Sequence, residues 1–248
     1  MTDRVEVIPL RGLPALREGD DLATELVAAA NRAGGLRDGD IVVVAQKAVS
    51  KVEGRVVTLA AIEPSARAVE LAGEDGDPRQ LEAILGETVR VVRSRPPLLI
   101  AETRHGFVCA SAGVDASNAP EAGTLVLLPV DPDASAARLR AALETLGGVC
   151  LGVVVSDSFG RAWRQGTTDV ALGAAGIVTL LDLRGRRDAT GYELHATQIA
   201  VADEIAGAAE LVMGKTNGVP AAIVRGLDAA GEGTAAELVM PAERDLFR

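Results

Sequence analysis

The chain has 248 residues, 48% hydrophobic and 24% charged, a composition that excludes collagen-like, disulfide-rich and disordered chains. Its formal charge of −10 and its 2% of aromatic residues argue against a nucleic-acid binder, which needs basic patches and stacking rings. The sequence shows neither a signal-peptide pattern nor an apolar run long enough to cross a bilayer. We therefore expect a cytoplasmic protein with no membrane or nucleic-acid partner.

Strands and helices alternate irregularly in the first half of the chain. Apolar alternation and short apolar runs predict strands at residues 5–10, 41–45, 89–92, 98–101 and 107–110. Helical spacing predicts a helix over residues 22–30 that is capped by Asp20 or Asp21, and further helices over 64–72 and 81–85.

The second half continues in the same irregular way. Strands are predicted at residues 125–128, 149–155, 177–181 and 222–224, and helices at 133–143, capped by Asp133, and at 199–212. The 149–155 strand is expected to end at Ser156, before a glycine-spaced segment that reaches Gly176. Together these patterns predict an α+β fold with mixed or antiparallel sheets and packed helices. Residues 1–248 are expected to form one functional unit in two interleaved subdomains.

Standard enzyme motifs fail when they are tested against this sequence. Gly214-Lys215-Thr216 resembles the end of a P-loop, but Ala209 replaces the first glycine, and a helix precedes the triplet where a strand is required. No Rossmann fingerprint and no Cys-x-x-Cys pair occur, and Cys109 and Cys150 are expected to be buried free thiols. The glycine-rich turn can still contact a phosphate through its backbone N–H groups and its lysine.

Acidic residues at the ends of predicted strands are the remaining chemical signal. Asp115 and Asn118 share one loop, and Asp157 and Ser158 follow the 149–155 strand. Carboxylate, amide and hydroxyl oxygens suit Mg²⁺ or Mn²⁺. The same aspartates are equally consistent with Asx turns that only stabilise loops.

Basic residues lie near these acidic loops. Arg161 and Arg164 follow Asp157, and Lys47 and Lys51 follow the 41–45 strand four residues apart. Arginines in this setting suit phosphate or carboxylate groups, although solvated loop ion pairs and plain surface lysines explain them as well.

Several motifs in a shared order resemble a known family. They are Val49-Ser50-Lys51-Val52-Glu53-Gly54-Arg55, Ala112-Gly113-Val114-Asp115-Ala116-Ser117-Asn118 and Asp157-Ser158-Phe159-Gly160-Arg161. With the 202–206, 220–226 and 231–233 segments, they resemble the coenzyme F420-0:L-glutamate ligase family, which includes the N-terminal domain of bifunctional actinobacterial F420 ligases. The resemblance extends over essentially the whole chain.

The resemblance implies a ligase that uses GTP and Mg²⁺ or Mn²⁺ to join L-glutamate to the phospholactyl carboxylate of F420-0 or its dehydro form. It implies an intertwined homodimer with sites at the interface, and a fold that is not Rossmann, P-loop or ATP-grasp. The metal ligands would be Asp115, Asp157 and Ser158, and Arg161 and Arg164 would act with Asp157 in catalysis. Residues implied to surround GTP are Leu13, Pro14, Ala15, Leu16, Gln46, Lys51, Asn118, Met213, Gly214, Lys215, Thr216, Asn217, Gly218 and Val219.

Two positions depart from the family pattern. Gln46 stands where relatives often carry Ser, and Lys215 stands where some archaeal relatives place a Glu metal ligand. Either one metal loses a ligand, or the lysine replaces metal charge at the phosphates. A metal-dependent nucleotide phosphohydrolase and a non-catalytic nucleotide or coenzyme sensor remain as alternative functions.

Overall fold

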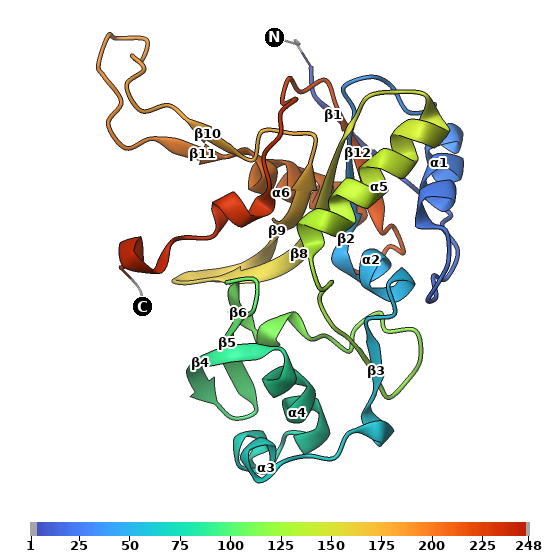
Figure 1. Cartoon of the computed structure of the whole chain (residues 1–248), viewed down its shortest axis with the longest axis vertical. Coiled ribbons are helices and arrows are strands. Elements are labelled where there is room, and N and C mark those ends of the chain that lie inside the picture. Colours follow the sequence, from blue (N-terminus) through green and yellow to red (C-terminus); the bar gives the residue numbers. More distant parts are fainter. Residues whose placement is uncertain (1–3, 247–248) are drawn as a thin grey trace.

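The protein is built around a mixed five-stranded sheet, described by a computed structural model for residues 4–246. The strand order is β1 (Glu6–Pro9), β12 (Ala221–Arg225), β2 (Ile41–Ala45), β8 (Gly152–Arg161) and β9 (Arg164–Ala175). Within this sheet β2 and β8 run parallel, and the other neighbours are antiparallel (Figure 1). The mixed sheet and its packed helices confirm the predicted α+β class.

Helices cover both faces of this sheet. Helices α1 (Leu22–Arg32) and α5 (Pro132–Gly147) pack on one face, and α6 (Val201–Met213) packs on the other. Strand side chains alternate between faces, so Val42 and Val44 join the first core and Ile41 and Val43 the second. This two-sided burial explains why the 41–45 strand is an unbroken apolar run.

A smaller unit is inserted between α2 (Gln46–Val52) and α5, and it has a core of its own (Figure 1). Its core includes Leu71, Leu81, Ile84 and Leu99. The unit consists of β3 (Val56–Thr58), α3 (Ala66–Ala72), α4 (Pro78–Gly86), β4 (Thr88–Arg95), β5 (Leu98–Thr103), β6 (Val108–Ala110) and β7 (Thr124–Val126).

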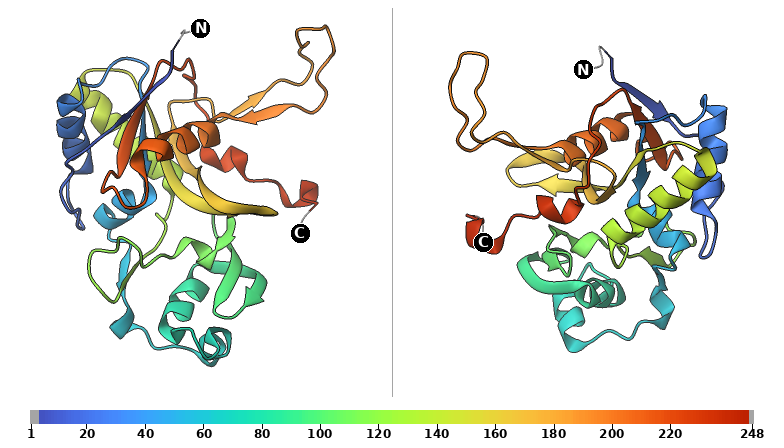
Figure 2. Two further views of the ribbon diagram at one scale, coloured as in Figure 1. Left: turned by 180° about the vertical axis from the view of Figure 1, so that it is seen from behind. Right: turned by 45° about the horizontal axis from the view of Figure 1, so that its top comes forward.

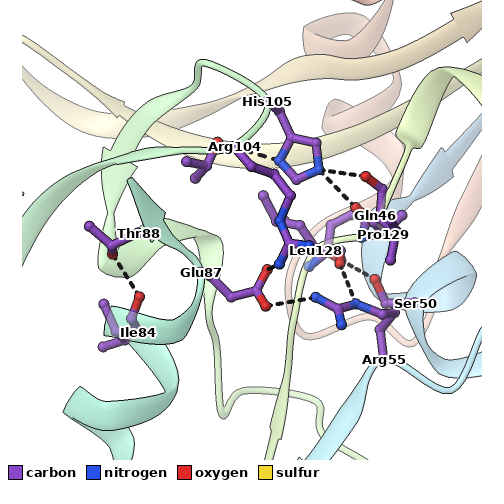
Figure 3. Close-up of polar contacts among 12 residues, drawn as sticks. Gln46, Ser50, Arg55, Ile84, Glu87, Thr88, Arg104, His105, Leu128 and Pro129 are labelled. Atoms are coloured by element: carbon purple, nitrogen blue, oxygen red, sulfur yellow. Dashed lines mark hydrogen bonds and ion pairs between the residues drawn. The ribbon is translucent and has the colours of Figure 1, made fainter. Parts of the chain in front are cut away.

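Polar contacts tie the inserted unit to the two segments that connect it to the body (Figure 3). The Glu87 carboxylate forms ion pairs with the guanidinium groups of Arg55, at 2.9 Å, and Arg104, at 2.6 Å. The ring Nε2 of His105 lies 3.0 Å from the carbonyl oxygen of Pro129. Because Arg55 and Pro129 lie on the two connecting segments, these contacts fix the inserted unit against the body.

Two strand pairs reach outward from the body. The β8–β9 hairpin extends beyond the sheet toward the inserted unit, and a long arm carries β10 (Leu180–Asp182) and β11 (Gln198–Ala200) away from the body (Figures 1 and 2). Among residues 4–246, no helix has the length and apolar character needed to span a membrane.

Several local predictions are wrong, each for a physical reason. Strand β8 continues through Asp157 to Arg161, because β9 supplies its backbone hydrogen-bond partners. This part of β8 is polar, so the hydrophobic pattern of the sequence does not predict it as a strand. The glycine-spaced segment up to Gly176, to which the sequence patterns assign no element, is therefore mostly β9. Helix α2 is missed by the sequence patterns because it begins directly after β2 without a side-chain cap that would mark its start.

One cap and one cysteine also differ from prediction. Asp131, not Asp133, caps α5 by accepting the Ala134 N–H at 2.9 Å. The Asp133 carboxylate instead accepts the Ala174 and Ala235 N–H groups, each at 2.8 Å. Cys109 is buried as predicted, but Cys150 is exposed, because it lies in the link between α5 and β8.

Candidate functional site

Two lysines line a cavity of the body that encloses about 310 Å³. Lys47 and Lys51 are one helical turn apart on α2, so both project toward the same side. The Lys47 ammonium lies 2.7 Å from Asp115 Oδ2. Burial and the nearby Lys47 lower the pKa of Lys51. The cavity therefore has a concentrated positive wall that suits an anionic ligand.

Asp115 lies beside this wall, in the loop between β6 and β7 of the inserted unit. Its backbone pairs with Val126, and its carboxylate accepts the Ser117 N–H and hydroxyl, each at 2.7 Å. The Lys215 ammonium is 3.8 Å from the same carboxylate oxygen that receives Lys47. Burial acts to raise the pKa of Asp115, but the hydrogen bonds from Lys47 and Ser117 hold it below its ordinary value.

The opposite wall of the cavity comes from the β8–β9 hairpin. Asp169 of β9 is buried and accepts hydrogen bonds from the Ser156 hydroxyl at 2.8 Å and the Ser158 hydroxyl at 2.7 Å. Ser156 and Ser158 are two residues apart, so they share one face of β8, and Asp157 belongs to the other face. All four residues line the cavity.

Asp157 has the most perturbed carboxylate of this group. Its pKa is raised to about 6, mainly by burial and to a smaller extent by the charges of Asp169 and Asp115, while attraction to Lys47 and the Ser158 N–H hydrogen bond oppose the shift. The structure therefore brings Asp115 and Asp157, which are 42 positions apart in the sequence, into one electrostatic environment. Three carboxylates close to one another are costly unless a cation compensates them.

The remaining walls come from loops at both ends of the chain. The turn after α6 contributes Lys215, and the Asn118 amide donates to the Lys215 carbonyl at 3.3 Å. Glycines at positions 214 and 218 have positive φ values, which let this turn curve around the cavity. The cavity is lined by the predicted residues Leu13, Pro14, Ala15, Leu16, Lys51, Asn118, Asp157, Ser158, Met213, Gly214, Lys215, Gly218 and Val219.

Other predicted residues lie away from the cavity lining. Gln46 is fully buried, and its side-chain oxygen accepts from the Ser50 hydroxyl (Figure 3). Thr216 and Asn217 belong to the turn after α6 but do not line the cavity. Asp115 does not line it either, but it forms an ion pair with the lining residue Lys47. Arg161 and Arg164 are at the tip of the β8–β9 hairpin, exposed to solvent.

Sequence reasoning does not select four polar lining residues as site residues: Lys47, Ser156, Asp169 and Glu210. Lys47 stands out in the sequence only as a basic residue after a strand. Asp169 can be found only from the hairpin register, which pairs it with Ser158. Glu210 is in the last turn of α6, where burial and the charge of Asp169 raise its pKa.

The donor set of the hairpin wall fits a hard divalent cation. In the part of the chain that the structure describes, no three His, Cys, Asp or Glu side chains form a ready-made metal cluster. The Asp157 carboxylate nevertheless carries an undercompensated charge, and the hydroxyl of the next residue, Ser158, directs its proton to Asp169. The lone pairs of Ser158 can therefore accept a hydrogen bond or ligate a cation. Magnesium and manganese combine a few such oxygens with waters and substrate phosphates, so the residues present fit such an ion.

Comparison with known proteins identifies the family. The family model described as F420-0:Gamma-glutamyl ligase matches residues 12–226. Three relatives are each named coenzyme F420:L-glutamate ligase. The Methanothermobacter thermautotrophicus protein is 43% identical over 98% of this chain and 99% of its own length. The Archaeoglobus fulgidus protein is 44% identical over 99% and 97%, and the Methanopyrus kandleri protein is 46% identical over 100% and 98%. The chain belongs to the F420-0:gamma-glutamyl ligase family.

Proposed function

We infer that this protein is a coenzyme F420-0:L-glutamate ligase, which joins L-glutamate to the phospholactyl carboxylate of F420-0 in the biosynthesis of coenzyme F420. The observation that carries this conclusion is the match with named ligases along nearly the full length of both chains. The cavity agrees with this activity because it combines lysines for anions with acidic and hydroxyl oxygens for a cation.

We place GTP in this cavity as the co-substrate. Lys47, Lys51 and Lys215 supply three positive charges that can face a triphosphate. The apolar segment Leu13–Leu16 and the glycine-containing turn around Gly218 leave room for the nucleoside. Because GTP is a cytoplasmic nucleotide, we expect the reaction to take place in the cytoplasm.

A divalent cation, Mg²⁺ or Mn²⁺, would be held by Asp157, Ser158 and Asp115. When bound, it supplies positive charge next to the phosphate oxygens that become more negative during transfer. Two observations support this proposal: the charge of Asp115 contributes to the raised pKa of Asp157, and the Ser158 hydroxyl donates its proton to Asp169.

Two bond exchanges then form the amide. A phospholactyl carboxylate oxygen attacks the γ-phosphorus of GTP, the bond from that phosphorus to the β-bridging oxygen breaks, and GDP leaves. The glutamate amine then attacks the acyl carbon, the carbon–oxygen bond to the phosphoryl group breaks, and phosphate and one proton are released. Lys47 and Lys51 hold the anionic groups in place, so the protein contributes mainly position and charge compensation.

Lys215 takes the position at which the resemblance places a Glu metal ligand in some relatives. Its ammonium is 3.8 Å from Asp115 and lines the cavity. An ammonium cannot ligate a cation, so we propose that this lysine replaces part of the metal charge at the phosphates.

We also propose a homodimer, in which the exposed hairpin tip meets a second protomer or the bound substrate. Arg161 and Arg164 flank Trp163, which is 80% exposed. An exposed tryptophan between two arginines is typical of a contact surface. In that setting Arg161 and Arg164 can bind the acyl phosphate or a substrate carboxylate, and light scattering combined with size-exclusion chromatography tests the dimer.

The experiment that tests the function is mass spectrometry of F420-0 incubated with the protein, GTP, Mn²⁺ and L-glutamate. We expect a product heavier by one or more glutamyl units and an equivalent amount of GDP. Release of GDP without F420-0 or glutamate indicates a phosphohydrolase instead. Tight GTP binding with neither product indicates a sensor. Either of these results contradicts the ligase assignment.

A further inference from the structure

A second cavity, of about 260 Å³, adjoins the outer edge of β9. Phe107 and Val108 of the β5–β6 region form one wall, and Phe159 and Val170 of the hairpin form another. Gly106, Ala171, Asp203 of α6, the segment 238–240 and Asp245 complete the lining. The cavity is therefore enclosed by the body, the inserted unit and the segment near the C-terminus.

The walls of this second cavity hold an unusual share of the aromatic residues. The chain has three phenylalanines, and Phe107 and Phe159 both line this cavity. Their rings meet edge to face with centroids 6.1 Å apart, and His105 stacks on Phe107 at 5.4 Å. Aromatic faces and edges arranged in this way favour a flat, partly apolar ligand.

The charged side chains in this lining, Asp203 and Asp245, are both acidic. The Asp203 carboxylate accepts the Ala171 N–H at 2.9 Å through Oδ1, and it still has acceptor capacity for an N–H or O–H donor of a ligand. A carboxylate at this place repels phosphates and other carboxylates. The lining thus selects a flat neutral ring with a hydrogen-bond donor, and it disfavours the anionic ends of the substrates.

The second cavity lies one strand spacing from the main cavity. The register pairs Ser156 with Ala171 and Asp157 with Val170. In each pair the β8 residue lines the main cavity and its β9 partner lines the second one. Neighbouring strands are about 4.8 Å apart. A ligand that occupies both cavities therefore has to reach across this one strand pair.

We propose that the second cavity binds the deazaflavin ring of F420-0, and this proposal rests on the ligase function given above. F420-0 carries a flat heteroaromatic ring with N–H and O–H donors at one end and the reacting phospholactyl carboxylate at the other. The ring lies against the pair formed by Phe107 and Phe159, which contact each other, and donates to Asp203. The phospholactyl end extends past Asp157 to the triphosphate in the main cavity.

The test is a fluorescence titration of F420-0, whose ring is itself fluorescent, against the wild type and three variants without glutamate. Val170→Trp fills the second cavity, and we expect its Kd for F420-0 to rise at least tenfold. Asp203→Asn keeps an acceptor for the Ala171 N–H but loses the charge, and we expect a rise of three- to tenfold. Val69→Trp adds the same ring on the exposed surface of α3 and should leave the Kd unchanged. Melting temperature and the Kd for GTP, measured in parallel, show that each variant is folded.

The outcomes separate this proposal from the ligase assignment. If the wild type forms glutamylated product but Val170→Trp and Asp203→Asn bind F420-0 like the wild type, the ring site is wrong and the function stands. If these variants lose GTP affinity and keep F420-0 affinity, the cavity binds the guanine ring, and the proposal is overturned. If F420-0 binding depends on the second cavity but no product forms, the site stands and the function fails.

Discussion

The two walls of the main cavity compensate their carboxylates in opposite ways. Asp115, on the lysine wall, has Lys47 at 2.7 Å and Lys215 at 3.8 Å, and its pKa is lowered. Asp157, on the hairpin wall, has no lysine or arginine within ion-pair distance in the described residues 4–246, and its pKa is raised to about 6. The lysine wall is balanced by the protein's own side chains, whereas the hairpin wall carries a charge that a bound cation would compensate. The undercompensated charge of Asp157 therefore lowers the stability of the folded protein when no cation is bound.

Substitution of Asp157 should have the largest effect and tests this contrast directly. We expect Asp157→Asn or Asp157→Ala to lower kcat by about 10²–10³-fold, the typical cost of removing an electrostatic stabiliser. We also expect Asp157→Asn to raise the melting temperature at pH 7–8 without added metal, because it removes an undercompensated charge. Kinetics and calorimetry measure both effects, and Glu63→Gln, on an exposed residue, is the control. Activity within about tenfold of wild type would remove Asp157 from the mechanism.

The pH dependence of stability sharpens the same prediction. The folded-state pKa of Asp157, about 6, lies above the ordinary value of 3.8. The stability that this shift contributes is fully present below pH 3.8 and is lost as pH rises through 6. Relative to Asp157→Asn, the wild type should lose about 1–3 kcal/mol of unfolding free energy over this interval. Parallel unfolding curves for the two proteins across this range would contradict the raised pKa.

Lys47→Met should have the next largest effect, because it converts the balanced wall into an unbalanced one. The variant keeps the apolar stem but leaves Asp115 without its 2.7 Å partner. We expect GTP affinity to fall about 10–100-fold, in line with the roughly 1.4 kcal/mol that corresponds to each factor of ten. Titration calorimetry measures the Kd, and Lys47→Met/Asp115→Asn should recover part of the loss of stability. An unchanged Kd for GTP would show that Lys47 pairs with Asp115 but does not contribute to GTP binding.

Asp169→Asn should have a smaller effect that acts through Ser158. The amide cannot accept both hydroxyl protons as the carboxylate does, so the lone pairs of Ser158 turn away from the cavity. We expect Mn²⁺ affinity in the presence of GTP to fall about tenfold, measured by electron paramagnetic resonance. Ser156→Ala removes one of the two hydrogen bonds and keeps the one from Ser158, so it should bind Mn²⁺ almost normally. Equal losses in both variants would contradict the positioning role.

Lys51→Ala should have the smallest effect. Lys51 lines the cavity and burial lowers its pKa, but no ion pair within the described residues depends on it. We expect the KM for GTP to rise about three- to tenfold, with little change in melting temperature because no packed partner is lost. Steady-state kinetics at several GTP concentrations test this. An unchanged KM would make Lys51 a surface lysine without a role in binding.

Much of the architecture can be predicted from the sequence because it depends on local patterns. The apolar run 41–45 predicts a strand buried on both faces, and the alanine-rich period before Met213 predicts α6. The failed P-loop test is informative because residue order alone places a helix before Gly214 and a strand after it. Residue type and spacing leave Asp115, Asp157 and Lys51 open between structural and binding roles, and only the family resemblance assigns them to a site.

The tertiary structure alone decides how these residues work together. The register of the β8–β9 hairpin places Asp169 beside Ser156 and Ser158, and it separates the two cavities by one strand pair. The inserted unit returns the chain so that Asp115 meets Lys47. Such contacts join residues that are far apart in sequence, and burial, which shifts the pKa of Asp157, depends on everything packed around it. Local sequence determines which elements form, whereas charge compensation and pocket shape arise only when those elements pack.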